Sequence, residues 1–187
     1  MVESFKSFAL MEREGTKTPK VPGDCPKATS NITMSQSEKF KERWDVALRK
    51  VFGVVFSMSK HYLYDRQGDP RNEDPITICE LDLMLQDFIT KRGREFMKDV
   101  DEIKRGVAKP RGINKEKIPH NNLEFVITSR SCDINWVMVM KQDYKKDGTC
   151  VILPSTIMRK RGFKVNKGER IMVEGVEHNI QRVYEVD

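Results

Sequence analysis

A set of basic residues is the first feature of this chain that could do chemistry. The set lies in the second half of the sequence, in an expected loop near residue 110, at the end of an expected strand, and between later strands. Its members are Lys109, Arg111, Lys115, Arg130, Lys145, Lys146, Arg159, Lys160, Arg161 and Lys164. Cations gathered on one edge of a sheet neutralise phosphates, so we expect this set to bind DNA, RNA or an acidic partner. The alternative is a solvated basic face without a partner.

Residues that could catalyse a reaction are few and scattered. His120, Arg130 and Tyr144 are of the types that position RNA and move protons when a 2′-hydroxyl attacks its own strand. A lone histidine beside a proline is more often an ordinary loop residue. We therefore expect no catalytic residue.

Metal-binding patterns are also weak. Three carboxylates of one expected helix suggest a metal site, but they are better explained as surface residues whose charge matches the helix dipole. They are Glu80, Asp82 and Asp87. The four cysteines and three histidines lack the close pairs that a structural zinc site needs. The chain contains no phosphate-binding P-loop, no GxGxxG and no GxSxG. The sequence thus predicts no metal and no cofactor.

Three of the cysteines fall inside apolar stretches of the sequence. Cys79, Cys132 and Cys150 are therefore expected to be buried thiols. Free thiols are typical of a reducing cytoplasm, of a cell or of an infected cell. The longest apolar run, residues 51–58, is too short to span a membrane, and the first residues lack the apolar region of a secretory signal. We expect no membrane partner.

Length and charge set further bounds. A chain of 187 residues is long enough for one good core. A formal net charge of +6 makes a polyanion a reasonable partner, although many proteins with this charge bind none. Residues 1–34 contain closely spaced Gly and Pro residues, which predict a flexible tail or an extended arm that wraps a neighbouring subunit. Residues 35–106 should form a helical part and residues 107–187 a sheet, together one domain.

The first helix is expected to begin at Ser35, which could form a capping box with Glu38. Apolar residues recur three and four positions apart from Phe40 to Val55, as in a helix that packs on a core. The helix is expected to end near Lys60.

Two shorter helices are expected next. The second should begin at Thr77, with Glu80 as its capping partner, and stop at Gly93. The third should span residues 94–105. A glycine at the junction predicts an angular helix pair lying against the sheet.

Five apolar segments over residues 123–187 predict a mostly antiparallel sheet. The segment around Trp136 is apolar on both sides, so it should be the central strand. The next strand should return through a turn with Gly148, and a final hairpin should have Gly168 at its entry and Gly175 at its tip. The predicted fold is α+β: three helices packed on a mostly antiparallel sheet or small barrel, with an extended N-terminal arm.

The end of the chain, GFKVNKGERIMVEGVEHNIQRVYEVD, resembles the closing segment of head–tail joining and head-closure proteins of tailed phages. In those proteins a glycine, an acidic residue and alternating apolar residues around a second glycine form a hairpin of a small barrel. The matching residues are Gly168, Glu169, Ile171, Val173, Gly175, Ile180 and Val183. The N-terminal ESFKSFALME is similar to capsid-targeting segments that a phage protease removes. The resemblance implies a virion protein that contacts neighbouring subunits, as a homo-oligomer, and packaged DNA.

The central region resembles a different family. Two helices, a basic loop and the strands LEFVITSR, INWVMVMK and TCVILPSTI are similar in order to RelE-type endoribonucleases and their phage relatives. In that family helices lean on a small antiparallel sheet whose basic face holds RNA. The family's HxxxR-type signature is not found, because the matching helix reads LDLMLQDFITKRG, without histidine. This departure puts cleavage in doubt more than the fold.

The function expected from the sequence is that of a phage virion structural protein of the neck or head–tail region, located in the virion or the host cytoplasm. The alternative is a RelE-like RNA-binding protein or endoribonuclease. A third possibility is a small nucleic-acid-binding regulator.

Overall fold

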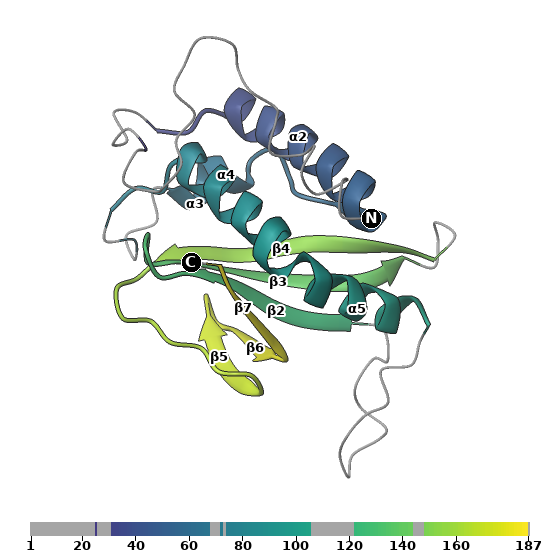
Figure 1. The fold of residues 1–187 in the computed structure, drawn as a ribbon. Helices are drawn as coiled ribbons and strands as arrows, with labels where there is room; N and C mark the ends of the chain where they lie inside the picture. The colour runs from purple at the N-terminus through teal and green to yellow at the C-terminus, as the bar shows by residue number, and fades with distance from the viewer. Residues whose placement is uncertain are drawn as a thin grey trace.

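The structure is a computed structural model, which describes residues 25, 31–67, 72, 74–105, 122–143 and 148–186. It consists of a five-stranded sheet with helices on one face and a two-stranded hairpin on the other (Figure 1). The α+β class is confirmed. Of the expected arm over residues 1–34, only residues 25 and 31–34 are among those described, and the rest of that prediction lies outside them.

The first described helix, α2 (Met34–Phe52), begins and ends earlier than predicted. Thr33 caps it, with Gln36 as the reciprocal partner, so the expected capping box of Ser35 and Glu38 is wrong. Gly53 adopts a left-handed φ of 63° and stops the helix, because glycine pays no steric cost there. The three residues that follow form strand β1 (Val54–Phe56). The sequence did not predict this strand, because its apolar residues continue the helical spacing of the residues before it.

The later helical residues form one long element rather than an angular pair. After the short helix α3 (Tyr62–Gln67), helix α4 (Ile78–Asp87) runs through a π-helical turn, η3 (Phe88–Arg92), into α5 (Gly93–Lys104). The predicted stop at Gly93 is wrong, since this glycine has a helical φ of −56° and its N–H donates to the carbonyl of Ile89. The predicted capping box of Thr77 and Glu80 is confirmed.

The main sheet has the strand order β1-β4-β3-β2-β7. Strands β2 (Asn122–Ser129), β3 (Ile134–Asp143) and β4 (Thr149–Arg159) are antiparallel neighbours, and β3 is central, as predicted. At the two edges β1 pairs with β4, and β7 (Arg182–Glu185) pairs with β2, both in parallel. Because β1 and β7 lie at opposite ends of the order, the described sheet is open, and the alternative of a small barrel is wrong.

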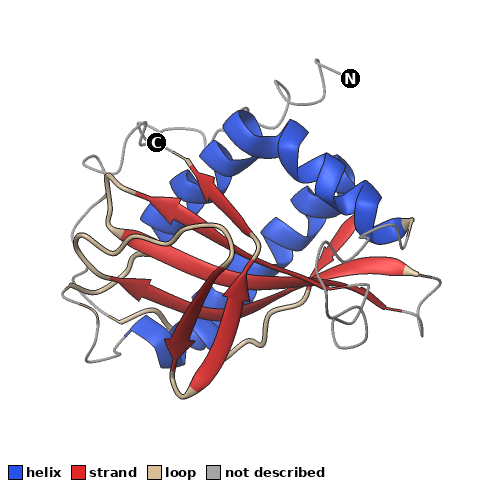
Figure 2. Ribbon diagram, turned by 90° about the horizontal axis from the view of Figure 1, so that it is seen from below, coloured by secondary structure: helices blue, strands red, loops and turns tan. Residues whose placement is uncertain are grey.

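The predicted C-terminal hairpin is confirmed as β5 (Glu169–Val173) and β6 (Val176–Ile180). Glu174 and Gly175 both have positive φ, at 56° and 76°, which fits the twist of a tight two-residue turn. Apolar residues of the hairpin pack with Val126 and Val137 of the main sheet in a second, smaller core. Figure 2 shows the hairpin on the side of the sheet opposite the helices.

The larger core lies between the helices and the sheet and is rich in aromatic rings. One carboxylate is buried beside it: Asp99 of α5, which is 5% exposed. Asp99 accepts a hydrogen bond from the Tyr184 hydroxyl and pairs with Arg182 at 3.1 Å. Burial and the neighbouring Asp99 carboxylate raise the pKa of Tyr184 above its usual value.

Among the described residues no helix is both long and apolar enough to cross a membrane.

The buried Tyr184 should make stability depend on pH in the alkaline range. The pKa of Tyr184 is about 10 in the unfolded chain and is higher in the folded chain. The stability that this difference provides is therefore fully present below about pH 10 and is lost as the pH rises above that value. Above pH ~10, each further pH unit should lower the free energy of unfolding of the parent by about 1.4 kcal/mol more than that of Tyr184→Phe. Urea unfolding at a series of pH values measures both slopes. Parallel curves below about pH 9 are the control, and parallel curves at every pH would contradict this role of Tyr184.

Candidate functional site

A groove of about 350 Å³ lies at the end of the sheet where β2 turns into β3. Three of the predicted basic residues line it: Arg130 from the β2–β3 turn, and Lys160 and Lys164 from the segment after β4. Two carboxylates, Asp133 and Glu185, line it as well. We call this cavity the basic groove.

Backbone contacts hold the two walls of the basic groove together. The N–H of Lys160 donates to the carbonyl of Asp133 over 3.0 Å, which fixes the segment after β4 against the β2–β3 turn. Asp133 has a positive φ of 54°, and Gly162 of 69°, so both walls turn sharply. The floor contains the buried side chains of Thr128 and Asn135, whose oxygens are 3.2 Å apart in a hydrogen bond. The groove is therefore a built feature of the fold.

The charges of the groove are only weakly neutralised. Arg130 pairs with Glu185 at 2.7 Å, but the arginine side chain is 74% exposed. Lys160 lies 6.0 Å from the centre of the Phe163 ring, a partly buried apolar surface in the groove. An exposed ion pair contributes about 0–1 kcal/mol, so a phosphate can replace Glu185 at Arg130 with little cost. Three cations against two carboxylates leave the groove positive.

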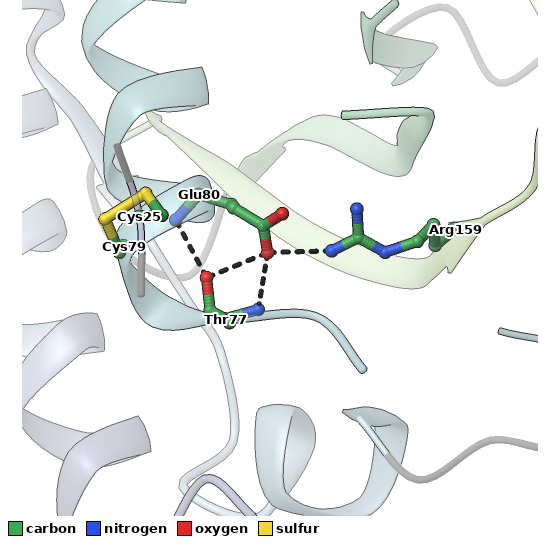
Figure 3. The surroundings of a disulfide bond; sticks show 5 residues. All are labelled: Cys25, Thr77, Cys79, Glu80 and Arg159. Carbon is green, nitrogen blue, oxygen red and sulfur yellow. Dashed lines mark hydrogen bonds and ion pairs between the residues drawn. A yellow bond between two sulfur atoms is a disulfide. The ribbon is translucent and has the colours of Figure 1, made fainter. Parts of the chain in front are cut away.

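Arg159, one of the predicted binding residues, makes its contacts within the fold. Its guanidinium donates to the carbonyls of Asp74, Pro75 and Cys132 and to the Glu80 carboxylate, at distances of 3.1, 3.2, 2.7 and 2.7 Å. The side chain is only 12% exposed. Figure 3 shows it reaching Glu80 at the start of α4. Arg159 thus joins the helices to the sheet and is not free to bind a phosphate. The sequence shows an arginine in a basic run but not a partner 79 residues away.

The remaining predicted residues divide into two groups. Arg161 is 79% exposed and lies 3.8 Å from Asp133, outside the lining of the groove. The others lie outside the described residues, as do the possible catalytic residues His120 and Tyr144. These others are Lys109, Arg111, Lys115, Lys145 and Lys146. The structure therefore brings together three of the five predicted cations that it describes.

The prediction that Cys79 is a buried thiol is wrong, because Cys79 forms a disulfide with Cys25. The two Cα atoms are 5.7 Å apart, within the usual range for a disulfide. Figure 3 shows this bond beside the Thr77–Glu80 capping box at the start of α4. Cys132 and Cys150 are buried free thiols, as predicted, and burial raises the pKa of Cys150. Widely spaced cysteines without a CxxC pair carry no sequence signal for this pairing.

The three carboxylates near residue 80 have protein partners instead of forming a metal site. Glu80 binds Arg159, Asp82 accepts hydrogen bonds from Arg43 and from Trp44, and Asp87 pairs with Lys91. Within the described ranges, no group of three histidine, cysteine or acidic side chains is placed to hold a metal ion.

Comparisons with known proteins leave the groove to be interpreted from its own geometry. No family model matches the chain, and no curated protein or solved structure shows significant similarity to it.

The structural role of Arg159 predicts a large difference between two neighbouring arginines. Arg159→Ala leaves the Glu80 carboxylate, itself 14% exposed, without its cation, and should lower the free energy of unfolding by about 3 kcal/mol. Arg161→Ala is the matched control and should change it by less than about 0.5 kcal/mol, because its ion pair is exposed. Chemical denaturation measures both. Equal effects of the two changes would contradict the assignment.

Proposed function

We propose that this protein binds nucleic-acid phosphates in the basic groove as a component of a larger assembly. The observation that carries the proposal is the convergence of Arg130, Lys160 and Lys164 on one cavity from two separate segments of the chain. Two of the three are lysines, which act as point charges for phosphate, and the arginine adds a planar fork of donors. The exposed pair of Arg130 with Glu185 leaves that fork available for exchange.

The size of the groove fits a short stretch of strand rather than a broad duplex surface. Its volume of about 350 Å³ is close to the lower end of the range for ligand sites, roughly 300–1,000 Å³. The cations line the cavity around Phe163, and the carboxylates Asp133 and Glu185 interrupt them. A continuous basic stripe, as duplex DNA requires, is not formed by these residues. We therefore favour one or two nucleotides of a single strand as the unit that is held.

The assembly that we propose is the neck or head–tail region of a tailed-phage virion. The C-terminal segment supports this proposal, since most of the residues that resemble phage head-closure proteins fold as a hairpin with a left-handed glycine at its tip, while Val183 lies in β7 of the main sheet. The Cys25–Cys79 disulfide supports it as well, because disulfides persist on virion surfaces and are rare in a reducing cytoplasm. The open sheet counts against the barrel of that family, so the support from the resemblance is limited to the hairpin.

A RelE-like endoribonuclease is the competing function, and the groove assay below tests it directly. Arg159, a candidate for the phosphate-binding cation of such an enzyme, is held by Glu80 and three backbone carbonyls. Cleavage of a single-stranded RNA oligonucleotide in that assay would favour this function over simple binding.

Removal of the two groove lysines should weaken binding and its dependence on salt. We expect Lys160→Ala/Lys164→Ala to reduce the affinity for a fluorescent single-stranded oligonucleotide and to lower the slope of log K against log salt by about 1.4, or about 0.7 for each lost phosphate contact. Lys39→Ala/Lys50→Ala, on exposed positions of α2, is the matched control with the same loss of charge. Fluorescence anisotropy at several salt concentrations measures the slopes. Equal slopes in the two double variants would show that only net charge matters and would contradict the groove.

The proposed virion role predicts self-association of the full chain. Light scattering coupled to gel filtration should show a discrete oligomer whose mass is a multiple of 21.8 kDa. A monomer at every concentration would contradict the virion role while leaving the groove proposal to its own assay.

A further inference from the structure

The opposite end of the same sheet face carries a second cluster of polar side chains. Ser155 of β4, His178 of β6 and Glu124 of β2 lie in a row: the serine Oγ is 3.3 Å from His178 Nε2, and His178 Nδ1 is 3.4 Å from Glu124 Oε2. We propose that these residues form a nucleophilic serine site in which Ser155 attacks the carbonyl carbon of an ester or a similar acyl donor. The inference is independent of the basic groove.

Ser155 is placed by an irregularity in the sheet. Val137 pairs with Thr156 and the adjacent Met138 pairs with Pro154, so Ser155 is the extra residue of a β-bulge and has no partner on β3. Bulges re-aim side chains and occur frequently beside active sites. Ser155 is partly exposed, whereas Thr156 next to it is buried. Regular alternation would point Ser155 to the sheet face opposite that of its neighbour Thr156, and the bulge turns it towards the hairpin instead.

The hairpin supplies the histidine and the sheet holds the carboxylate. His178 faces the sheet, opposite Ile171 in the hairpin register, and its side chain is 5% exposed. Glu124 Oε2 accepts a hydrogen bond from the backbone N–H of Asn179 at 2.8 Å. The N–H of Gln181 donates to the Glu124 carbonyl at 2.9 Å, which joins the end of the hairpin to β2. Glu124 is therefore fixed beside the imidazole by backbone contacts with the hairpin.

The chemistry of the partners selects one tautomer of His178. An ionised carboxylate can only accept hydrogen bonds, so Glu124 favours a proton on Nδ1. Nε2 then carries a lone pair and accepts the proton of the Ser155 hydroxyl. Nδ1 lies within ion-pair distance of Glu124 but has no well-aligned hydrogen bond. Such contacts in ligand-free enzymes are often poorly aligned and tighten when substrate binds. The order of groups is that of a serine nucleophile, a general base and a positioning carboxylate.

The proposed reaction balances without a cofactor. Ser155 Oγ forms a bond to the acyl carbon and gives its proton to His178 Nε2. The bond between that carbon and the leaving oxygen breaks, and His178 returns the proton to the leaving oxygen. Water then attacks the acyl carbon and gives a proton to His178, the bond between that carbon and Ser155 Oγ breaks, and His178 returns the proton to Oγ, which releases the carboxylic acid. Ser155 and His178 are the catalytic residues, and Glu124 is a positioning residue.

A fluorophosphonate probe tests the site on the full chain. Ser155 Oγ would displace fluoride from phosphorus, and peptide mass spectrometry would locate the adduct. We expect labelling at Ser155 that is lost in Ser155→Ala and kept in Ser59→Ala, a control at an exposed serine between β1 and α3. Circular dichroism and thermal unfolding confirm that both variants are folded. An unlabelled Ser155, or a label only on other serines, would overturn the proposal and leave the cluster as an anchor of the hairpin.

Glu124→Gln separates a catalytic cluster from an anchor. Glu124 Oε2 both accepts from Asn179 and lies beside His178 Nδ1, so a glutamine oxygen in its place can keep both contacts and the hairpin should remain in place. The neutral amide, however, no longer stabilises the imidazolium that forms when His178 takes the proton of Ser155. We expect the rates of labelling and of p-nitrophenyl acetate hydrolysis to fall about a hundredfold or more, with thermal stability unchanged. An unchanged labelling rate in Glu124→Gln would also overturn the proposal.

Discussion

A partly buried ion pair between Arg159 and Glu80 joins the helical layer to the sheet, and the placement of the candidate groove depends on it. Arg159 ends β4, and one wall of the basic groove is formed by its neighbours Lys160, Gly162, Phe163 and Lys164. Glu80 also completes the cap of α4 by accepting from Thr77, so one carboxylate fixes both a helix start and a strand end. Charges removed from water are stable only when every donor and acceptor is satisfied. The three backbone carbonyls around Arg159 meet that condition.

The hairpin β5–β6 divides the second face of the sheet into two sites. Its apolar residues cover Val126 and Val137 in the middle of the face. The basic groove lies beyond one side of this cover, at Thr128 and Asn135, and the serine cluster lies beyond the other, at Glu124. Glu124 and Thr128 are four residues apart on β2, or about 13 Å at the usual rise of a strand. The polar side chains of Glu124 and Thr128 thus lie on either side of the apolar residues that the hairpin covers.

Local patterns in the sequence predicted the features whose causes are local. The capping box at Thr77 and Glu80, the apolar β3 strand and the tight turn at Gly175 each follow from residues within a few positions of one another. The errors share the opposite cause. A glycine at position 93 ends a helix only where the backbone turns left-handed, and here the helix continues across the sheet. Strand β1 is explained by its pairing with β4, nearly a hundred positions away in the chain, which no helical periodicity can reveal.

The same reasoning explains why the basic residues could be identified but not assigned. Arg159, Lys160, Arg161 and Lys164 look alike in the sequence, as one basic run. In the fold the first is buried against Glu80, the second and fourth line the groove, and the third extends into solvent beside Asp133. The run crosses the end of β4 and enters a turn in which the Phe163 N–H donates to the Lys160 carbonyl, so neighbouring side chains point in different directions and meet different surroundings. The candidate site is therefore defined by which cations share a cavity. That is a property of the contact between two distant segments and not of charge density along the chain.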